Sequence, residues 1–494
     1  MSLVGQTIYT RHQQHARYPT AKNHMHLKLP PIEVPDAQPF ANDKLQRQQS
    51  ADLLCRFLST VPTPYVLAID AEWGQGKTTF LRMWERFLKN EGFPVHYFNA
   101  WEADYEPDPL IALMAEIRSF ASVRAKTQNP TEAKTIKKHA KAIGRVGIRI
   151  TQYALPKLIK AGTAGIIDAE ELSELFGKEA SEITEKVAEG ALNEYEKQKQ
   201  SLSDFKSELQ NLASSLAGEQ RKPLVILVDE LDRCRPTYAV ELIERIKHLF
   251  SVPGVVFVLA LDRHQLSATV QAVYGDRFDG SGYLKRHFDF EYAFPTPDLA
   301  NYCNFVYQSL GFDTLVDSRH LDINIKSPFL AFVRLTARAL NASLRDIAHV
   351  MSRMYVAFAL GKPGFSPDPR MLTVLAFTRH LDSDLYKNIL EGKVTSEVLI
   401  DRFRGVLGID ASLQDNEVPI LHGYLYVLVE SSTALRARAN EVTTKTDKSS
   451  PNLVRYNDTL IRVLAYHADE GHLRGQDSIR YTRGRLELSE QFRF

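Results

Sequence analysis

The segment from Tyr65 to Thr78 constrains the fold of this chain more than any other feature of its sequence. It begins with a short apolar run, Tyr65–Asp70, that is typical of a buried strand. A loop with two glycines follows, and from Lys77 the apolar residues take helical spacing. A strand, a glycine-containing loop and a helix in this order bind phosphate, because backbone N–H groups and the helix N-terminus point at the anion. The segment therefore predicts an α/β domain with a phosphate site after its first strand.

The loop itself, Ala71-Glu72-Trp73-Gly74-Gln75-Gly76-Lys77-Thr78, nearly fits the pattern G-x-x-x-x-G-K-[ST]. In this pattern the last glycine allows close backbone approach, the lysine offers charge to the β- and γ-phosphates, and the hydroxyl is a ligand of Mg²⁺. Ala71 replaces the first glycine, which costs free energy only where φ is positive. The alternative is a turn that enters a helix and carries these residues by chance. The residues expected to bind the nucleotide are Trp73, Gly74, Gln75, Gly76, Lys77, Thr78 and Thr79.

A second apolar run ends in acidic residues. Leu224–Val228 has the composition of a buried strand and is followed by Asp229, Glu230 and Asp232. In P-loop NTPases an aspartate at such a strand tip holds Mg²⁺, which assigns that role to Asp229 beside Thr78. Glu230 is the expected general base for the attacking water. Asp232 is expected to orient water or Mg²⁺, or to cap the next segment. A solvated acidic loop is the alternative, but the two motifs occur in the order that a shared site requires.

The order of the predicted elements gives the fold class. We expect an α/β protein with a P-loop NTPase core around a central, mostly parallel sheet, a helical insertion and an all-α C-terminal region. Further strands are predicted at Val95–Asn99, Val255–Leu261 and near Phe288–Phe294. The predicted parts are an N-terminal arm at 1–40, the core at 41–130 and 215–298, the insertion at 131–214, a helical lid at 299–362 and a C-terminal helical domain at 363–494.

Charge separates the two halves of the insertion. From Lys134 to Lys160 every charged residue is positive, whereas acidic residues dominate from Asp168 to Glu196. The favoured interpretation is an antiparallel hairpin in which the two charge blocks face each other. Contact of the basic helix with nucleic acid, or with a membrane surface or a protein, stays open. The basic stripe, at steps of three or four residues between 134 and 149, contains Lys134, Lys138, Lys141, Arg145 and Arg149.

Composition narrows the class of protein rather than its chemistry. The 494 residues have a formal net charge of +1, which gives no general attraction to nucleic acid or membranes. The three cysteines show no paired spacing, so neither a disulfide framework nor a zinc site is expected, and a reducing cytoplasm fits best. The most apolar long window, Ile143–Ile167, carries four cations, and the N-terminus lacks an apolar core. We therefore expect neither a transmembrane segment nor a secretory signal.

Taken together, the motifs resemble the KAP P-loop NTPases, a branch of the P-loop ATPases that use a catalytic glutamate. The resemblance covers roughly residues 41–360. Many members of the family insert transmembrane helices between the phosphate loop and the acidic strand, whereas the insertion in this chain is charged. The more specific pieces are Phe98-Asn99-Ala100-Trp101 and Val228-Asp229-Glu230-Leu231-Asp232-Arg233-Cys234, and the others are Glu72–Thr78, Val258–Arg263, Tyr283–Arg286 with Phe294-Pro295, and Leu340–Arg345.

The resemblance implies roles for residues outside the two motifs. It makes Arg286 and Arg345 candidates for contact with the γ-phosphate, within the chain or from a neighbouring subunit, and Trp101 a structural residue near the phosphate loop. The alternative for the two arginines is that each lies at the surface and pairs with a carboxylate. We also expect ATP and Mg²⁺ as ligands, a homo-oligomer, and a partner protein that acts as effector or sensor. Soluble bacterial KAP proteins are often found in systems that resist bacteriophage.

Three functions compete at this point. The first is an ATPase that couples ATP binding and hydrolysis to conformational change or assembly, with Glu230, Lys77, Asp232 and Arg286 as catalytic residues. The second is an ATP-dependent switch or scaffold that hydrolyses little and binds a protein or nucleic acid. The third is a phosphotransferase, which needs an acceptor pocket and an arginine-rich lid that the sequence does not indicate. The acidic strand end favours the first.

Overall fold

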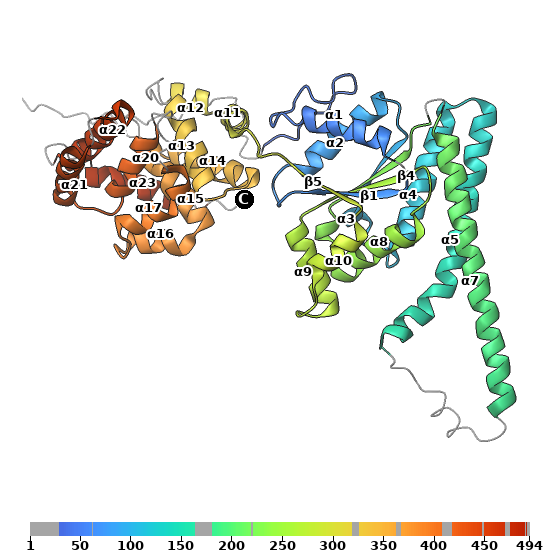
Figure 1. Ribbon diagram of the computed structural model, residues 1–494. Helices are drawn as coiled ribbons and strands as arrows, with labels where there is room; N and C mark the ends of the chain where they lie inside the picture. The colour runs from blue at the N-terminus through green and yellow to red at the C-terminus, as the bar shows by residue number, and fades with distance from the viewer. Residues whose placement is uncertain are drawn as a thin grey trace, which may run out of the picture.

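The computed structural model describes residues 29–61, 63–163, 180–218, 221–318, 326–361, 367–407, 417–446, 449–469, 475–489 and 491, and it leaves out the side chains of residues 147–195, 198 and 475–479. A part that contains a sheet and a part built only of helices lie next to each other in Figure 1, joined by the segment between β5 and α11. This arrangement confirms the predicted fold class.

Within the described residues the strands form one five-stranded parallel sheet in the order β2-β3-β4-β1-β5. The three central strands are nearly continuous apolar runs, as expected for parallel strands that are buried on both faces. Because all five run the same way, their carboxyl ends share one edge, where Asn99 lies beside Asp229. The strands are β1 Tyr65–Asp70, β2 Val95–Asn99, β3 Leu224–Asp229, β4 Val255–Leu261 and β5 Phe290–Ala293.

Helices surround this sheet and make up the second part. Those of the first part are α1 Gln48–Thr60, α2 Lys77–Asn90, α3 Ala100–Ala103, α4 Pro109–Arg124, η1 Ala125–Thr127, α5 Pro130–Thr163, α7 Ala180–Leu216, η2 Leu231–Arg233, α8 Pro236–Leu249, α9 Arg263–Tyr274 and α10 Gly280–His287. Those of the second part are α11 Leu299–Ser309, α12 Phe312–Ser318, α13 Lys326–Ala339, α14 Leu344–Ala359, α15 Pro369–Leu381, α16 Ser383–Leu390, α17 Ser396–Arg402, α18 Arg404–Leu407, α20 Val418–Val427, α21 Ser432–Lys445, α22 Pro451–Ala468 and α23 Gly475–Ser489.

Alternate residues of each strand face different helical layers. Leu67 and Ile69 of β1 belong to an apolar cluster with α1 and α2. Val66 and Ala68 belong to another cluster with α4, α8 and the long helices α5 and α7. This alternation follows from the two-residue period of a strand. It places the phosphate loop, which joins β1 to α2, at the carboxyl edge of a sheet that is covered on both faces.

The insertion consists of α5 and α7, which lie side by side and extend well beyond the sheet (Figure 1). Near the sheet, Ile136 and Ile143 of α5 are buried in one cluster with Phe205 of α7. A polar contact in the same region joins His139 Nδ1 to Glu208 Oε2 at 2.6 Å. The two helices therefore form a hairpin, but the packing described here is apolar and lies outside the acidic block that the prediction pairs with the basic helix.

The basic stripe lies on the solvent side of α5. Lys134, Lys138, Lys141 and Arg145 are all exposed. The side chain of Arg149 lies outside the described ones, as do those of the acidic block except Glu196. Pairing between the two charge blocks stays a prediction, and so does binding of nucleic acid by the stripe.

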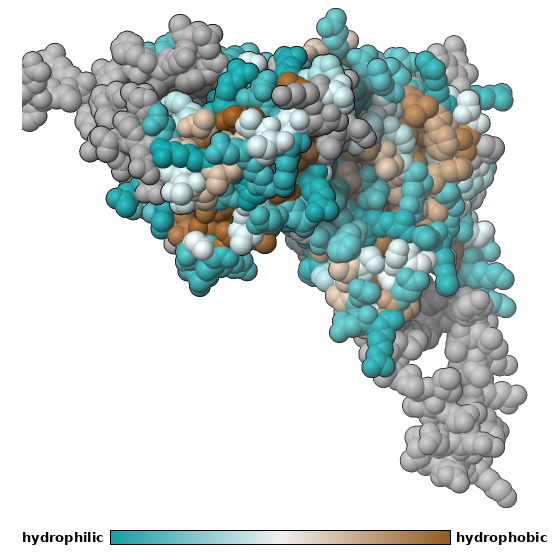
Figure 2. Space-filling model, turned by 60° about the vertical axis from the view of Figure 1, so that its left-hand side comes forward, coloured by the Kyte–Doolittle hydropathy of each residue, from teal (hydrophilic) through white to brown (hydrophobic). Residues whose placement is uncertain are grey.

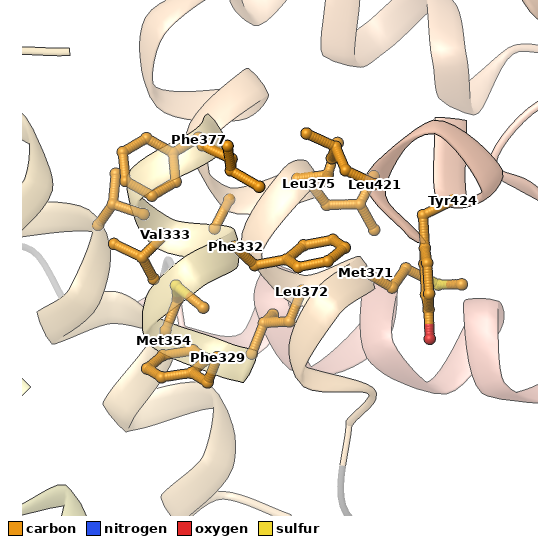
Figure 3. Close-up of a cluster of buried hydrophobic side chains, with 14 of the residues drawn as sticks. Phe329, Phe332, Val333, Met354, Met371, Leu372, Leu375, Phe377, Leu421 and Tyr424 are labelled. Carbon is orange, nitrogen blue, oxygen red and sulfur yellow. The ribbon is translucent and has the colours of Figure 1, made fainter. Parts of the chain in front are cut away.

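The helical part is built around one apolar core. Figure 3 shows Phe332 of α13 at its centre, surrounded by side chains of α14, α15 and α20. The cluster includes Met354 and Leu372, which lie on either side of the predicted boundary at residues 362–363. A division into lid and C-terminal domain stays a prediction.

The described surface is mostly hydrophilic on the side shown in Figure 2, with apolar residues in small patches. Among the helices described here, none is both long enough and apolar enough to cross a lipid bilayer.

Truncation of Phe332 tests the core of the helical part. We expect Phe332→Ala to lower the free energy of unfolding by about 3–5 kcal/mol, because the side chain is fully buried and a cavity remains. Urea denaturation followed by circular dichroism measures the change. Tyr466→Ala is the control, since this side chain is more than half exposed and its loss is expected to cost under about 0.5 kcal/mol. Equal effects of the two substitutions would contradict the described packing.

Candidate nucleotide-binding site

The phosphate loop connects β1 to α2 at the carboxyl edge of the sheet. Gly74 and Gly76 have φ values of +81° and +80°, which glycine adopts without the strain that a Cβ would bring. Gly76 is also the N-cap of α2, so free backbone N–H groups of the first helical turn begin here. Ala71 is not among the described residues with positive φ. The alanine in place of the first glycine therefore causes no backbone strain.

Lys77 and Asp232 connect the loop to the acidic strand end. The ammonium group of Lys77 donates to the carbonyl of Ala71 at 2.6 Å and lies 3.7 Å from Asp232 Oδ2. The same Oδ2 accepts hydrogen bonds from the indole Nε1 of Trp73 at 2.7 Å and from the backbone N–H of Asp262 at 3.0 Å. With its side chain only 3% exposed, Asp232 holds the loop in place. The sequence suggested roles toward water, metal or a cap, but not this one.

Asp262 and Arg263, which follow β4, form hydrogen bonds and a salt bridge within the protein. Asp262 caps α9 and also accepts a hydrogen bond from the backbone N–H of Trp73 at 3.1 Å. Arg263 donates to Glu291 at 2.7 Å. Arg263 therefore forms a salt bridge at the end of β4.

The acidic strand end meets the phosphate loop directly. The hydroxyl of Thr78 donates to Glu230 Oε1 at 3.1 Å, although 152 residues separate the two. Asp229 is 1% exposed and accepts hydrogen bonds from the Tyr97 hydroxyl at 2.7 Å and from the N–H of Glu230 at 2.9 Å. Glu230 has a φ of +61°, which turns the chain sharply after β3. The convergence that the two motifs require is therefore present.

Electrostatics concentrate negative charge at this point. Burial raises the pKa of Glu230 above its ordinary value, and the neighbouring Asp229 carboxylate adds to the rise. Arg233 opposes it, with Nε 2.5 Å from Glu230 Oε2. Burial, and then Asp229, also raise the pKa of Tyr97, so its hydroxyl remains a donor to Asp229. Two neighbouring carboxylates favour the binding of a cation. Such a cation can in turn bind an anionic ligand.

A cavity of about 750 Å³ opens over the loop, which is a size typical of small-molecule sites. Its wall contains segments of the N-terminal arm, the core and the helical part. It also contains most of the predicted site residues, namely Trp73, Gly74, Gly76, Lys77, Thr78, Thr79, Asp229, Glu230, Asp232 and Arg345.

The start of α14 packs against the loop. A Cβ added to Gly74 would lie 2.7 Å from Ser343 Oγ, which is closer than such atoms approach, and 3.1 Å from Arg345 Cβ, which is a tight contact. Ser343 is the N-cap of α14 and forms a capping box with Asp346, which fixes the direction of the first turn. Only glycine fits where these two segments meet. The helical part thereby presents Arg345 to the cavity.

The site has the order and geometry of a P-loop domain, and residues 47–356, more than half of the chain, match the family described as the KAP family P-loop domain. The chain belongs to this family. The match confirms the resemblance that the sequence motifs carry and supports a nucleotide-binding, ATPase-type function for the KAP domain.

Other comparisons add little. No curated protein matches the chain. Two solved structures of the Aeropyrum pernix ORC2 protein, in ADPNP–ADP complexes and in the ADP form, share 13% and 12% identity with it. They cover 90% of this chain and 99% and 97% of their own, with TM-scores of 0.32 and 0.31. The family assignment therefore rests on the domain match.

Two predicted site residues of the KAP domain lie outside the cavity wall. Gln75 is part of the loop but does not line the cavity. Arg286 is exposed in the last turn of α10. It lies three residues before Asp289, which accepts a hydrogen bond from the N–H of Val66 at the start of β1. That is the edge of the sheet opposite the phosphate loop, so Arg286 does not approach the site within one chain. Contact from a neighbouring subunit stays a prediction.

Trp101 is also placed differently from a core residue. It is 54% exposed on α3, and the guanidinium carbon of Arg233 lies 5.9 Å from its ring centroid. It is thus a surface residue beside the acidic strand end, and its structural role stays a prediction.

Sequence analysis missed the residues that precede α1. Pro30 and Ile32, assigned to the arm, line the cavity together with Leu45 and Arg47. No motif marks them. One signal was available for Arg47: it precedes the buried residues Ala51, Leu54 and Leu58 at helical spacing and so continues their apolar face. A charged residue on an apolar face indicates a buried cation.

A substitution at Gly74 tests the contact between the loop and α14. We expect Gly74→Ala to lower the free energy of unfolding by about 1–2 kcal/mol through its positive φ and, in addition, to weaken nucleotide binding by displacing the start of α14. The control is Gly311→Ala, because Gly311 has a φ of +76° but an added Cβ meets nothing within 4 Å. Thermal unfolding and nucleotide titration of both variants measure the two effects. Unchanged nucleotide affinity of Gly74→Ala would show that the packing of α14 is not part of the site.

Proposed function

We propose that this chain is an ATPase that couples binding and hydrolysis of Mg²⁺-bound ATP to a conformational change or to assembly. The observation that carries this proposal is the hydrogen bond between Thr78 and Glu230. It joins the end of the phosphate loop to the end of β3 at the wall of one cavity. A metal ligand, a candidate base and phosphate-binding N–H groups therefore converge where the terminal phosphates of a nucleotide would lie.

The metal site fits Mg²⁺. This ion takes oxygen ligands and keeps only one or two of them from the protein, the rest coming from phosphates and water. The Thr78 hydroxyl and the Asp229 carboxylate are such ligands, and Tyr97 orients the carboxylate. In the described residues no group of three or more His, Cys, Asp and Glu side chains is placed to hold a metal alone. When bound, Mg²⁺ neutralises charge on the β- and γ-phosphates.

The remaining residues act on the phosphates and the attacking water. Lys77 supplies a positive charge to the β- and γ-phosphates in place of its contacts with loop carbonyls. Glu230 holds and deprotonates water, and its raised pKa makes it a stronger base than an ordinary carboxylate. Asp232 acts through Lys77 and Trp73 by keeping the loop in position.

Coupling to the helical part goes through α14. Arg345 lies in the first turn of that helix and lines the cavity beside Gly74. An arginine that pairs with the γ-phosphate releases it after hydrolysis, so the position of α14 depends on the state of the nucleotide. A partner protein, a homo-oligomer with Arg286 acting from a neighbouring subunit, and a role in resistance to bacteriophage belong to the same proposal.

One observation favours a second function, an ATP-dependent switch with little hydrolysis. Glu230 has both oxygens engaged, one by Thr78 and the other by Arg233. Arg233 lowers the pKa of Glu230 against the rise that burial causes, so Glu230 is a weaker base with this pair than without it. In this version a partner turns hydrolysis on by breaking the contact between Arg233 and Glu230. The partner is either a protein or a nucleic acid bound at the basic stripe of α5. Stimulation of ATP turnover by Arg233→Ala would support the switch.

Replacement of Glu230 separates binding from hydrolysis. We expect Glu230→Gln to lower the rate of ATP turnover by at least about 100-fold, because the general base is lost, while the affinity for ATP stays within a few-fold of that of the unaltered protein. Lys77→Ala is expected to lose both. Phosphate release measures the turnover, and nucleotide titration measures the affinity. Glu241→Gln, at an exposed position of α8, is the control. Normal turnover by Glu230→Gln would remove this residue from the mechanism.

A further inference from the structure

Arg47 is a buried cation at the wall of the nucleotide cavity. It is 3% exposed, and none of its three guanidinium nitrogens has a hydrogen-bond partner in the part of the chain that the structure describes. Burial of a charged group without a partner is costly, so a folded protein rarely keeps one unless a ligand uses it. Arg47 is therefore the most conspicuous unsatisfied group at this site.

The surroundings of Arg47 keep its guanidinium group charged but give it no hydrogen-bond acceptor among the described residues. The guanidinium carbon lies 3.8 Å from the ring centroid of Phe294, so one face of the group is covered by an aromatic ring. Asp43 is the nearby carboxylate, but it accepts hydrogen bonds from the backbone N–H groups of Leu45, Arg47 and Gln48. Burial lowers the pKa of Arg47 to about 10, and Asp43 and Tyr292 offset this only in part. The group is still positively charged at neutral pH.

The backbone directs this charge at the phosphate loop. Gln46 has a positive φ of 56°, which turns the chain immediately before Arg47. A Cβ added to Gly76 would lie 3.8 Å from Arg47 Nη1, so the guanidinium is next to the last glycine of the loop. In loops of this pattern the backbone N–H groups cradle the α- and β-phosphates. Arg47 thus approaches the part of the phosphate chain that ATP and ADP share.

We propose that Arg47 is a nucleotide-binding residue that donates hydrogen bonds to an α- or β-phosphate oxygen, and so anchors ATP and ADP alike. This inference rests on the proposed function, since it assumes that the cavity binds a nucleotide. Phosphate oxygens are the acceptors that suit a guanidinium group best, because both charge and planar geometry match. The anchor places the N-terminal segment of the KAP domain in direct contact with the ligand. The γ-phosphate is left to Lys77, Glu230 and Arg345.

Arg47→Met tests the proposal, since methionine fills similar space without the charge. Two changes of opposite sign are expected in the full chain. The melting temperature without nucleotide rises, because an unpaired buried charge is removed. The affinities for ATP and for ADP both fall by about 10- to 100-fold and by the same factor, because a charged hydrogen bond common to both is lost. Arg56→Met, at an exposed position of α1, is the control and changes neither quantity.

The measurements are thermal unfolding and calorimetric titration with ATP, ADP and GTP. Unchanged affinity for ATP and ADP in Arg47→Met would overturn the proposal, as would a lower melting temperature together with weaker binding, which indicates a structural role. A change confined to the ratio of ATP to GTP affinity would assign Arg47 to the base and also overturn it. The unaltered protein and Lys77→Ala are titrated alongside. If the unaltered protein binds no nucleotide, the proposed function itself fails, and this outcome is distinct from the others.

Discussion

The parallel register of β1, β4 and β3 is the constraint on which the site depends. It brings the end of β1 and the end of β3 to one edge of the sheet, so Thr78 and Glu230 meet across a gap of 152 residues in sequence. The long insertion between them does not disturb this register, because α5 and α7 begin and end on one face of the sheet and pack there with α4 and α8. An insertion of this kind enlarges the helical layer on one face of the sheet and leaves the carboxyl edge of the sheet open.

A single buried carboxylate then fixes the loop relative to that edge. Asp232 accepts from Trp73 of the loop and from the backbone at the end of β4, and it lies near Lys77. Because one oxygen serves the indole and the backbone N–H at once, movement of the loop changes both contacts together. The position of the Lys77 ammonium group is therefore set by its contact with Asp232, and not only by the flexible side chain that carries it.

Sequence reasoning placed residues together where strand polarity decides the contact, and it missed contacts that depend on tertiary packing. Asp229 and Glu230 lie at the end of one apolar strand, and the loop with Lys77 and Thr78 follows another, so strand polarity alone brings them to one edge of the sheet. Asp232 could be selected as a site residue, but its contact with Trp73 depends on how two loops pack. Arg47 and the close approach of Ser343 to Gly74 join segments that are distant in sequence, and no pattern of residue types encodes such meetings.

The cavity is assembled from three segments that are separate along the chain. The loop supplies Lys77 and Thr78, the end of β3 supplies Asp229 and Glu230, α14 supplies Arg345, and the segment before α1 supplies Arg47. Two of the cations, Arg47 and Lys77, are buried. In the proposed function a phosphate chain neutralises these charges, so binding strengthens contacts among all three segments at once. Under the proposed function, loss of the terminal phosphate weakens the interaction with α14 while the inner phosphates keep Arg47 engaged, so hydrolysis changes the attachment of the helical part in particular.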